Sequence, residues 1–445
     1  MASGPPGTAR FAPQAFNRQA GVAGLTLARE AFMHTGLRTL DLRPLLGLLA
    51  LAVLVAGLGL AGCAQKPREQ QGKLDTPDHH VLRGNDLLEQ DRWSDAENEF
   101  NLALSLDRDY GPAMSGLAIV RAHAASQANP DNKGRLTEQA LDLADKGLGK
   151  AKDDDAKRAA RVAFIRVYTY AQSPESWLKK AGNEWEKAVD LDKRKQDPDP
   201  DFFMARAYRS GFEWTKAMDA YNRVLTLNKG RQQQANDELA LVQKIVRAAP
   251  GSLHGKLIAI QPALSRADVA ALLVEELLVS RLYERGNTQR FDTEFKAPTQ
   301  AGGQIQVDTM QHMPEATDIA NHPLRSDIEE VMRLKVLGLE PLPDRQFHPN
   351  ETMSRAEFAM LIEDVLAHVT GEQGLKTKFF GQRSPFPDVR GDLPYFNAVQ
   401  TAVTRNLMEP KNRIQGTFGP AEPVSGADAL LAIRAMKDEL RSYVR

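Results

Sequence analysis

The sequence predicts a mostly α-helical protein with an N-terminal export segment, a helical solenoid and a compact C-terminal unit of three related modules. Three observations lead to this prediction. An apolar run ends at the only cysteine of the chain, Cys63. Apolar and small residues recur at helical spacing over residues 79–230. A box of the form Ser-X-Ala-acid then occurs three times after residue 235, each time before an apolar stretch.

The N-terminal segment is typical of an export signal. Leu45–Leu60 contains only Leu, Ala, Val and Gly, and the basic residues Arg38 and Arg43 precede it. An uncleaved transmembrane anchor is the alternative interpretation, because the apolar run approaches the length that spans a bilayer. Residues 1–32 fit neither a signal nor a folded domain, so we expect translation to begin at Met33, an unusually long basic region being the alternative.

The end of this signal carries a more specific pattern. The sequence Leu60-Ala61-Gly62-Cys63 resembles the lipobox of bacterial lipoproteins. The resemblance implies cleavage before Cys63, a covalent lipid on its thiol, a signal peptide at 1–62 and a polar, lipidated tether at 63–78. Because no Asp follows the cysteine, the resemblance also implies an outer membrane location, facing the periplasm.

Composition argues against several classes of function. The chain has 57 basic and 58 acidic residues, a net charge of −1, whereas proteins that bind nucleic acid present a basic face. A single cysteine allows neither an intramolecular disulfide nor a thiolate metal cluster. The chain also lacks a nucleophile elbow, a phosphate loop and a metalloprotease box. We therefore expect no enzyme, no metal site, and no cofactor besides the lipid.

Residues 79–230 carry a helical repeat with a period of about 34 residues. Twelve residues separate Gly84 from Ala96, and the same distance separates Ala205 from Ala217. This pattern resembles the tetratricopeptide repeat, whose small residues let paired antiparallel helices approach closely. The resemblance implies a stacked solenoid with a concave groove that binds a peptide or protein partner. A spacer that binds nothing is the alternative.

The middle of the repeat region departs from this pattern. Residues 127–134 hold Pro, Gly and three Asn or Asp residues, and residues 153–155 are all Asp. Such residues favour turns. We therefore expect both stretches to lengthen the connections between helices.

The C-terminal half holds three unequal copies of a second motif, which we place at 235–285, 316–370 and 384–445, with a linker or insert at 286–315. The first copy is degenerate, and its first helix is expected near residues 239–246. These copies resemble the S-layer homology domain. The resemblance implies a pseudo-threefold helical unit, with short strands or turns, that binds acidic wall polysaccharide or peptidoglycan.

The Ser-X-Ala-acid box supplies the candidate site. A hydroxyl three residues before a carboxylate is a capping box, which satisfies free N–H groups at a helix start. Capping leaves the arginines of the first two boxes unexplained, and a guanidinium beside a helix N-terminus suits a carboxylate ligand. The predicted glycan-binding residues are Arg266, Arg355, Ser265, Ser354 and Glu357. A surface salt bridge is the alternative for the arginines, and Gly426 replaces the arginine of the third box.

Together these patterns predict a lipid-anchored adaptor of the cell envelope. Its lipid would hold the membrane, its C-terminal unit the wall glycan, and its repeats an envelope protein. The alternative is a lipoprotein of an envelope assembly or secretion complex, in which both regions are protein-interaction scaffolds. A glycan-processing enzyme would need a carboxylate pair in a groove, and the sequence offers no candidate pair.

Overall fold

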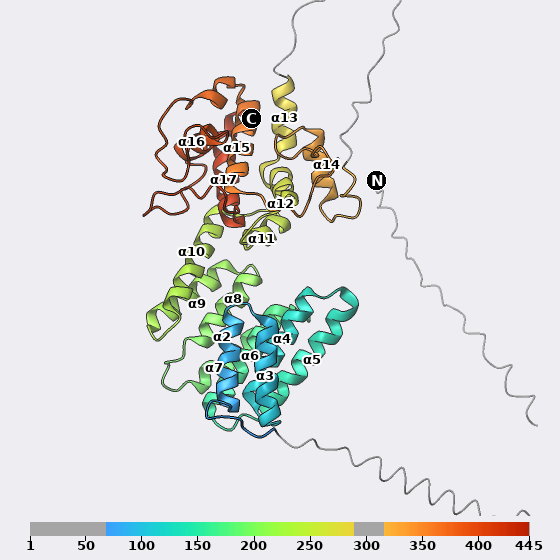
Figure 1. Ribbon diagram of the computed structural model, residues 1–445, viewed down its shortest axis with the longest axis vertical. Coiled ribbons are helices and arrows are strands. Elements are labelled where there is room, and N and C mark those ends of the chain that lie inside the picture. The colour runs from blue at the N-terminus through green and yellow to red at the C-terminus, as the bar shows by residue number, and fades with distance from the viewer. Residues whose placement is uncertain (1–67, 289–315, 445) are drawn as a thin grey trace, which may run out of the picture. The chain divides into compact units, whose positions relative to one another are not determined.

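The computed structural model describes residues 68–288 and 316–444 (Figure 1). Within these ranges every regular element is a helix, so the predicted mostly α-helical class is confirmed. In the C-terminal unit, where short strands or turns were expected, the described residues form isolated antiparallel bridges such as Ser265–Thr352. None of the described helices has the length and apolar character needed to cross a membrane. The predicted signal, Cys63 and most of the 286–315 insert lie outside the described residues.

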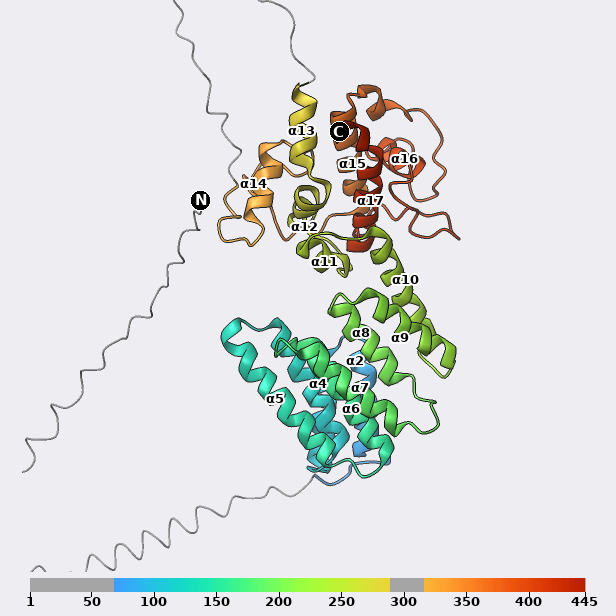
Figure 2. The ribbon, with the colours of Figure 1, turned by 180° about the vertical axis from the view of Figure 1, so that it is seen from behind.

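The first half of the described chain consists of consecutive helix pairs (Figure 2). Each pair packs closely, and the first helices of successive pairs also contact one another. The helices are α2 (Pro77–Glu89), α3 (Trp93–Leu106), α4 (Gly111–Gln127), α5 (Pro130–Gly149), α6 (Asp154–Ala171), α7 (Trp177–Leu191), α8 (Asp199–Ser210) and α9 (Trp214–Leu227). This arrangement is consistent with the expected solenoid.

Two glycines allow the helices α2, α3 and α4 to pack closely around a phenylalanine. Phe100 of α3 is fully buried. A Cβ atom added at Gly84 or at Gly116 would lie 2.5 or 2.4 Å from the Phe100 ring. Both glycines therefore make room for one ring, which joins α2, α3 and α4. Truncating such a ring costs about 3–5 kcal/mol.

The two polar stretches in the middle of the repeats begin helices instead of lengthening turns. Asn129 accepts a hydrogen bond from the N–H of Asn132 and caps α5, with Pro130 in the first turn. Asp153 caps α6 in the same way. Asn, Asp and Pro favour helix starts as strongly as turns, so the prediction of longer connections there was wrong.

The second half of the described chain begins with a helix that serves two cores. Ala235, Leu239 and Val242 of α10 (Gln232–Ala248) belong to the apolar cluster of the repeats, whereas Ile245 and Ala248 belong to the C-terminal cluster. The expected first helix of the first copy, at 239–246, lies within α10.

The remaining helices form the C-terminal unit. They are α11 (Leu253–Ala259), α12 (Arg266–Ala271), the π-helical turn η1 (Leu272–Leu277), α13 (Val279–Thr288), α14 (Arg325–Arg333), α15 (Arg355–Thr370), the 3-10 turn η2 (Gln373–Thr377), α16 (Phe396–Thr404), α17 (Gly426–Glu439) and α18 (Arg441–Val444). Each helix that follows a box packs on a first helix of the next copy: α12 on α14, α15 on α16, and α17 on α10. The contacts thus close into a cycle of three.

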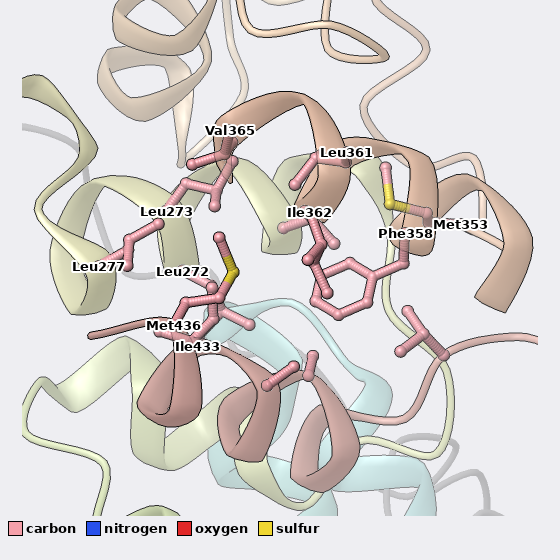
Figure 3. Packing of buried hydrophobic residues seen from close by; sticks show 14 of the residues in the cluster. Leu272, Leu273, Leu277, Met353, Phe358, Leu361, Ile362, Val365, Ile433 and Met436 are labelled. Atoms are coloured by element: carbon pink, nitrogen blue, oxygen red, sulfur yellow. The ribbon is translucent and has the colours of Figure 1, made fainter. Parts of the chain in front are cut away.

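The core of this unit lies where the three helices that follow the boxes meet. Leu272 and Leu277 of η1, Ile362 of α15, and Ile433 and Met436 of α17 come together there (Figure 3). All are nearly inaccessible to solvent. The boxes at the start of these helices are consequently held close to one another.

Candidate functional site

A closed ring of main-chain hydrogen bonds joins the three boxes. The residue just before each serine takes part. The N–H of Leu264 donates to the carbonyl of Val424 (3.0 Å), that of Val424 to Met353 (3.1 Å), and that of Met353 back to Leu264 (2.9 Å). Each residue therefore donates once and accepts once, so the three copies are related by an approximate threefold arrangement.

The serines and acids of the first two boxes cap their helices. Ser265 accepts from the N–H of Asp268 (3.2 Å), and the Asp268 carboxylate accepts from the Ser265 N–H (2.9 Å). Ser354 and Glu357 repeat both bonds at 3.2 and 2.7 Å. Three of the five predicted site residues, the two serines and the glutamate, are thus occupied in capping boxes, as their spacing indicated.

The first N–H groups of these helices are occupied as well. Arg266 donates its main-chain N–H to the carbonyl of Glu351 (2.9 Å), and Ala267 donates to Pro349 (3.1 Å). Arg355 and Ala356 make the corresponding bonds, at 2.8 and 3.0 Å, to carbonyls of the third copy. The helix N-termini that were expected to attract an anion therefore bind carbonyl groups of the next copy.

Arg355 is almost completely buried, at 2 % exposure. Its Nε donates to the carbonyl of Phe418 (2.8 Å), its Nη2 donates to that of Glu409 (2.6 Å), and its guanidinium stacks 4.7 Å from the Phe418 ring centre. Burial lowers the pKa of Arg355, and the nearby Asp428 carboxylate opposes that effect. The side chain therefore fastens the third copy to the second.

Arg266 makes equivalent contacts in a more open position. Its Nε donates to the Phe347 carbonyl (2.8 Å), and its guanidinium lies 4.9 Å from the Phe347 ring centre. Nη1 and Nη2 donate to the carbonyls of Gly338 (2.8 Å) and Glu340 (3.0 Å). A guanidinium has five N–H groups, so one N–H on each terminal nitrogen is left over.

Two aspartates that the site prediction omitted shape the turns that receive these arginines. Asp318 accepts from the N–H groups of Phe347 and His348, both at 2.8 Å. Asp388 does the same for Phe418 (3.0 Å) and the following glycine (2.7 Å). An Asp followed by Ile or Val at the start of each of these copies is the sequence signal that could have identified them.

Gly426 stands where the third box lacks an arginine, and the first copy explains why. Its N–H donates to the carbonyl of Gln261 (2.9 Å). A Cβ atom at this position would lie 1.7 Å from the carbonyl oxygen of Ile258, at the end of α11. The first copy places α11 where the other copies have a phenylalanine turn, so the contact accommodates only glycine. Ser425 still caps α17 by accepting from the N–H of Asp428 (3.2 Å).

The comparisons with known proteins identify the third copy. Residues 385–430 match the S-layer homology domain, a cell-wall-binding module. The match runs from the turn before Asp388 into α17. It associates the chain with the cell envelope. No curated protein and no solved structure matches the chain.

Proposed function

We propose that the protein is a lipid-anchored adaptor that binds cell-wall glycan through its C-terminal unit and a protein partner through its repeats. The observation that carries the proposal is the match of residues 385–430 to a wall-binding domain. The closed ring of hydrogen bonds supports the extension of that activity to all three copies, because each copy is held by the other two.

Within this proposal Arg266 is the residue that meets the glycan. Its unused N–H groups can donate to both oxygens of a carboxylate, a geometry that arginine favours. Arg355 has a positioning role, since its guanidinium is buried against Phe418. An acidic wall polysaccharide is the ligand class that fits such a cation.

Sedimentation with purified wall sacculi tests the wall-binding part. The chain from Ala64 onward is mixed with sacculi that are untreated or stripped of secondary polysaccharide. We expect binding that stripping removes, and an affinity about tenfold lower for Arg266→Gln, because hydrogen bonds to charged groups contribute about 1.5–3 kcal/mol. Arg390→Gln, which removes an exposed arginine paired with Asp392, is the matched control.

Two other outcomes would redirect the proposal. Binding that survives stripping would indicate peptidoglycan itself as the ligand. No binding to either preparation would contradict wall binding and favour the alternative, in which the protein is a scaffold of an envelope assembly or secretion complex.

The lipid anchor is tested separately. If Cys63 carries the lipid, Cys63→Ser should accumulate as an uncleaved, unlipidated precursor, and metabolic labelling with a fatty acid should disappear. Normal processing of this variant would contradict the proposed lipoprotein. Fractionation of the labelled wild-type protein tests the proposed outer membrane location.

A further inference from the structure

The C-terminal unit contains an apolar cavity of about 320 Å³, which we call the leucine cavity. The nearly inaccessible Leu277, Leu282 and Leu440 line it, together with the more exposed Leu278. The third box begins α17, whereas the cavity lies beside the last turns of that helix. Figures 1 and 2 show α13, which forms one wall, at the opposite end of the unit from α11. The leucine cavity is therefore separate from the boxes and from Arg266.

Four cations and one carboxylate complete the lining of the leucine cavity. The cations are Arg281, Arg434, Lys437 and Arg441, and the acid is Asp438. Asp438 pairs with Arg441 and lies 3.7 Å from Arg434. Arg281 and Lys437 form no ion pair with any described residue. The lining thus has an excess of three positive charges, and two of its cations are unpaired.

The neighbouring acids do not neutralise this excess. They are Glu275, Glu276, Glu284 and Glu439, and none of them lines the leucine cavity. The first two accept hydrogen bonds from α11 and from the turn that precedes it. Glu284 acts on the charge of Arg333, and Glu439 pairs with Arg405. A ligand with a negative charge therefore complements the cavity.

Leu278 has a main-chain conformation that leucine normally avoids. Its φ of 61° and ψ of 45° lie in the left-handed region, at the end of the π-helical turn η1. The corresponding helix of the second copy ends at Gly371, with a φ of 75°, and glycine is the usual residue there. Leu278 is 37 % exposed and lies outside the apolar clusters of the described residues, so core packing does not offset the strain. Strained residues and π-helical turns are both typical of binding sites.

The hydrogen-bonding groups of the lining favour a lipid over a peptide. Arginine and lysine side chains only donate hydrogen bonds, and the one carboxylate of the lining, Asp438, is engaged by arginine. A peptide in the cavity would bury main-chain N–H groups without side-chain acceptors, which is costly. An acyl chain has no such groups. A second copy of this chain, docked through the same face, would bring like charges together.

We propose that the leucine cavity binds one acyl chain of an anionic phospholipid, while the headgroup phosphate pairs with Arg281 and Lys437. The inference goes beyond the proposed function, because it gives the C-terminal unit a membrane contact of its own, in addition to the lipid on Cys63. Two linked attachments to one membrane hold more firmly than either alone.

Flotation with vesicles tests the inference on the chain from Ala64 onward, which carries no lipid. Vesicles of phosphatidylcholine and phosphatidylglycerol in equal parts are compared with vesicles of phosphatidylcholine alone. Glycerol phosphate serves as a headgroup without acyl chains. We expect binding to the anionic vesicles only. The double variant Arg281→Gln, Lys437→Gln should lower this binding about tenfold or more, because each cation close to an anionic surface adds to the affinity.

A change at Leu278 separates lipid binding from folding. Asparagine tolerates the left-handed conformation better than leucine does. Without vesicles, the melting temperature of Leu278→Asn should therefore equal or exceed that of the wild type, while its vesicle binding should fall about tenfold. Leu253→Asn is the matched control, because Leu253 is an exposed leucine on α11 outside the cavity, and this variant should bind vesicles normally.

Several results would overturn the inference. They are equal binding to both kinds of vesicle, binding of glycerol phosphate alone, normal vesicle binding by Leu278→Asn, or a clearly lowered melting temperature of that variant. A peptide alternating glutamate and leucine that binds where the vesicles do not would assign the cavity to a protein instead. Sedimentation of Leu278→Asn with sacculi separates this inference from wall binding, which should be unchanged.

Discussion

The repeats and the C-terminal unit both bury arginines against phenylalanine rings, yet the guanidinium groups are used differently. Arg355 stacks on Phe418 at 4.7 Å, and Arg166 stacks on Phe203 at 4.4 Å. Arg355 also donates to two carbonyl groups, whereas Arg166 donates to nothing among the described residues. Burial and stacking are therefore common to Arg355 and Arg166, and the hydrogen bonds to main-chain carbonyls are what set Arg355 apart.

The largest effect is expected from removing Arg355. Arg355→Ala leaves the carbonyls of Phe418 and Glu409 buried without donors, so the free energy of unfolding should fall by about 3 kcal/mol. Urea denaturation measures this change. Arg390→Ala, at an exposed position, should stay within about 0.5 kcal/mol of wild type. If the free energy of unfolding falls as little for Arg355→Ala as for this control, Arg355 is not a structural contact and does not differ from Arg166 in this respect.

The junction without an arginine should respond less strongly. Gly426→Ala places a Cβ atom against the Ile258 carbonyl, and we expect a loss of about 1–3 kcal/mol from forced main-chain movement. Gly374→Ala is the control, because a Cβ atom there would meet nothing within 4 Å. If both variants unfold alike, α11 does not replace the arginine contact at this junction.

The smallest effect concerns a paired cation in the repeats. Burial opposes protonation of His80, but hydrogen bonds to Asp75 (2.9 Å) and Glu99 (2.7 Å) outweigh it and raise the His80 pKa above its usual value. The stabilisation is therefore present at low pH and is lost as the pH rises through the raised pKa. Unfolding free energies between pH 5.5 and 8.5 should fall more for wild type than for His80→Asn. Parallel curves would show that His80 is not a paired cation.

Sequence reasoning succeeded where the interaction is local. The serine and the acid of a capping box are three residues apart, so Ser354 and Glu357 could be recognised from spacing alone. The use of Gly84 as a close-approach position was predictable for the same reason, since its partner Phe100 lies on the next helix. The same local reasoning failed at Asn129, because residues that favour turns also cap helices.

The contacts of the arginines could not be predicted in this way. Arg355 binds main-chain carbonyls 54 and 63 residues away, and every residue type carries a carbonyl. Gly426 contacts Ile258, although more than half of the C-terminal unit's sequence separates the two residues. Nor does the sequence show that Arg166 lacks a partner, since that depends on Glu238 being engaged by its neighbours.

The ring formed by Leu264, Met353 and Val424 has an evolutionary consequence. A ring of three has no free end, so deleting any one module would expose an unpaired donor and an unpaired acceptor at the centre of the other two. Main-chain hydrogen bonds do not depend on which side chain a residue carries, proline excepted. The first module can therefore drift far from the common motif, losing its phenylalanine turn, and still remain indispensable to the other two.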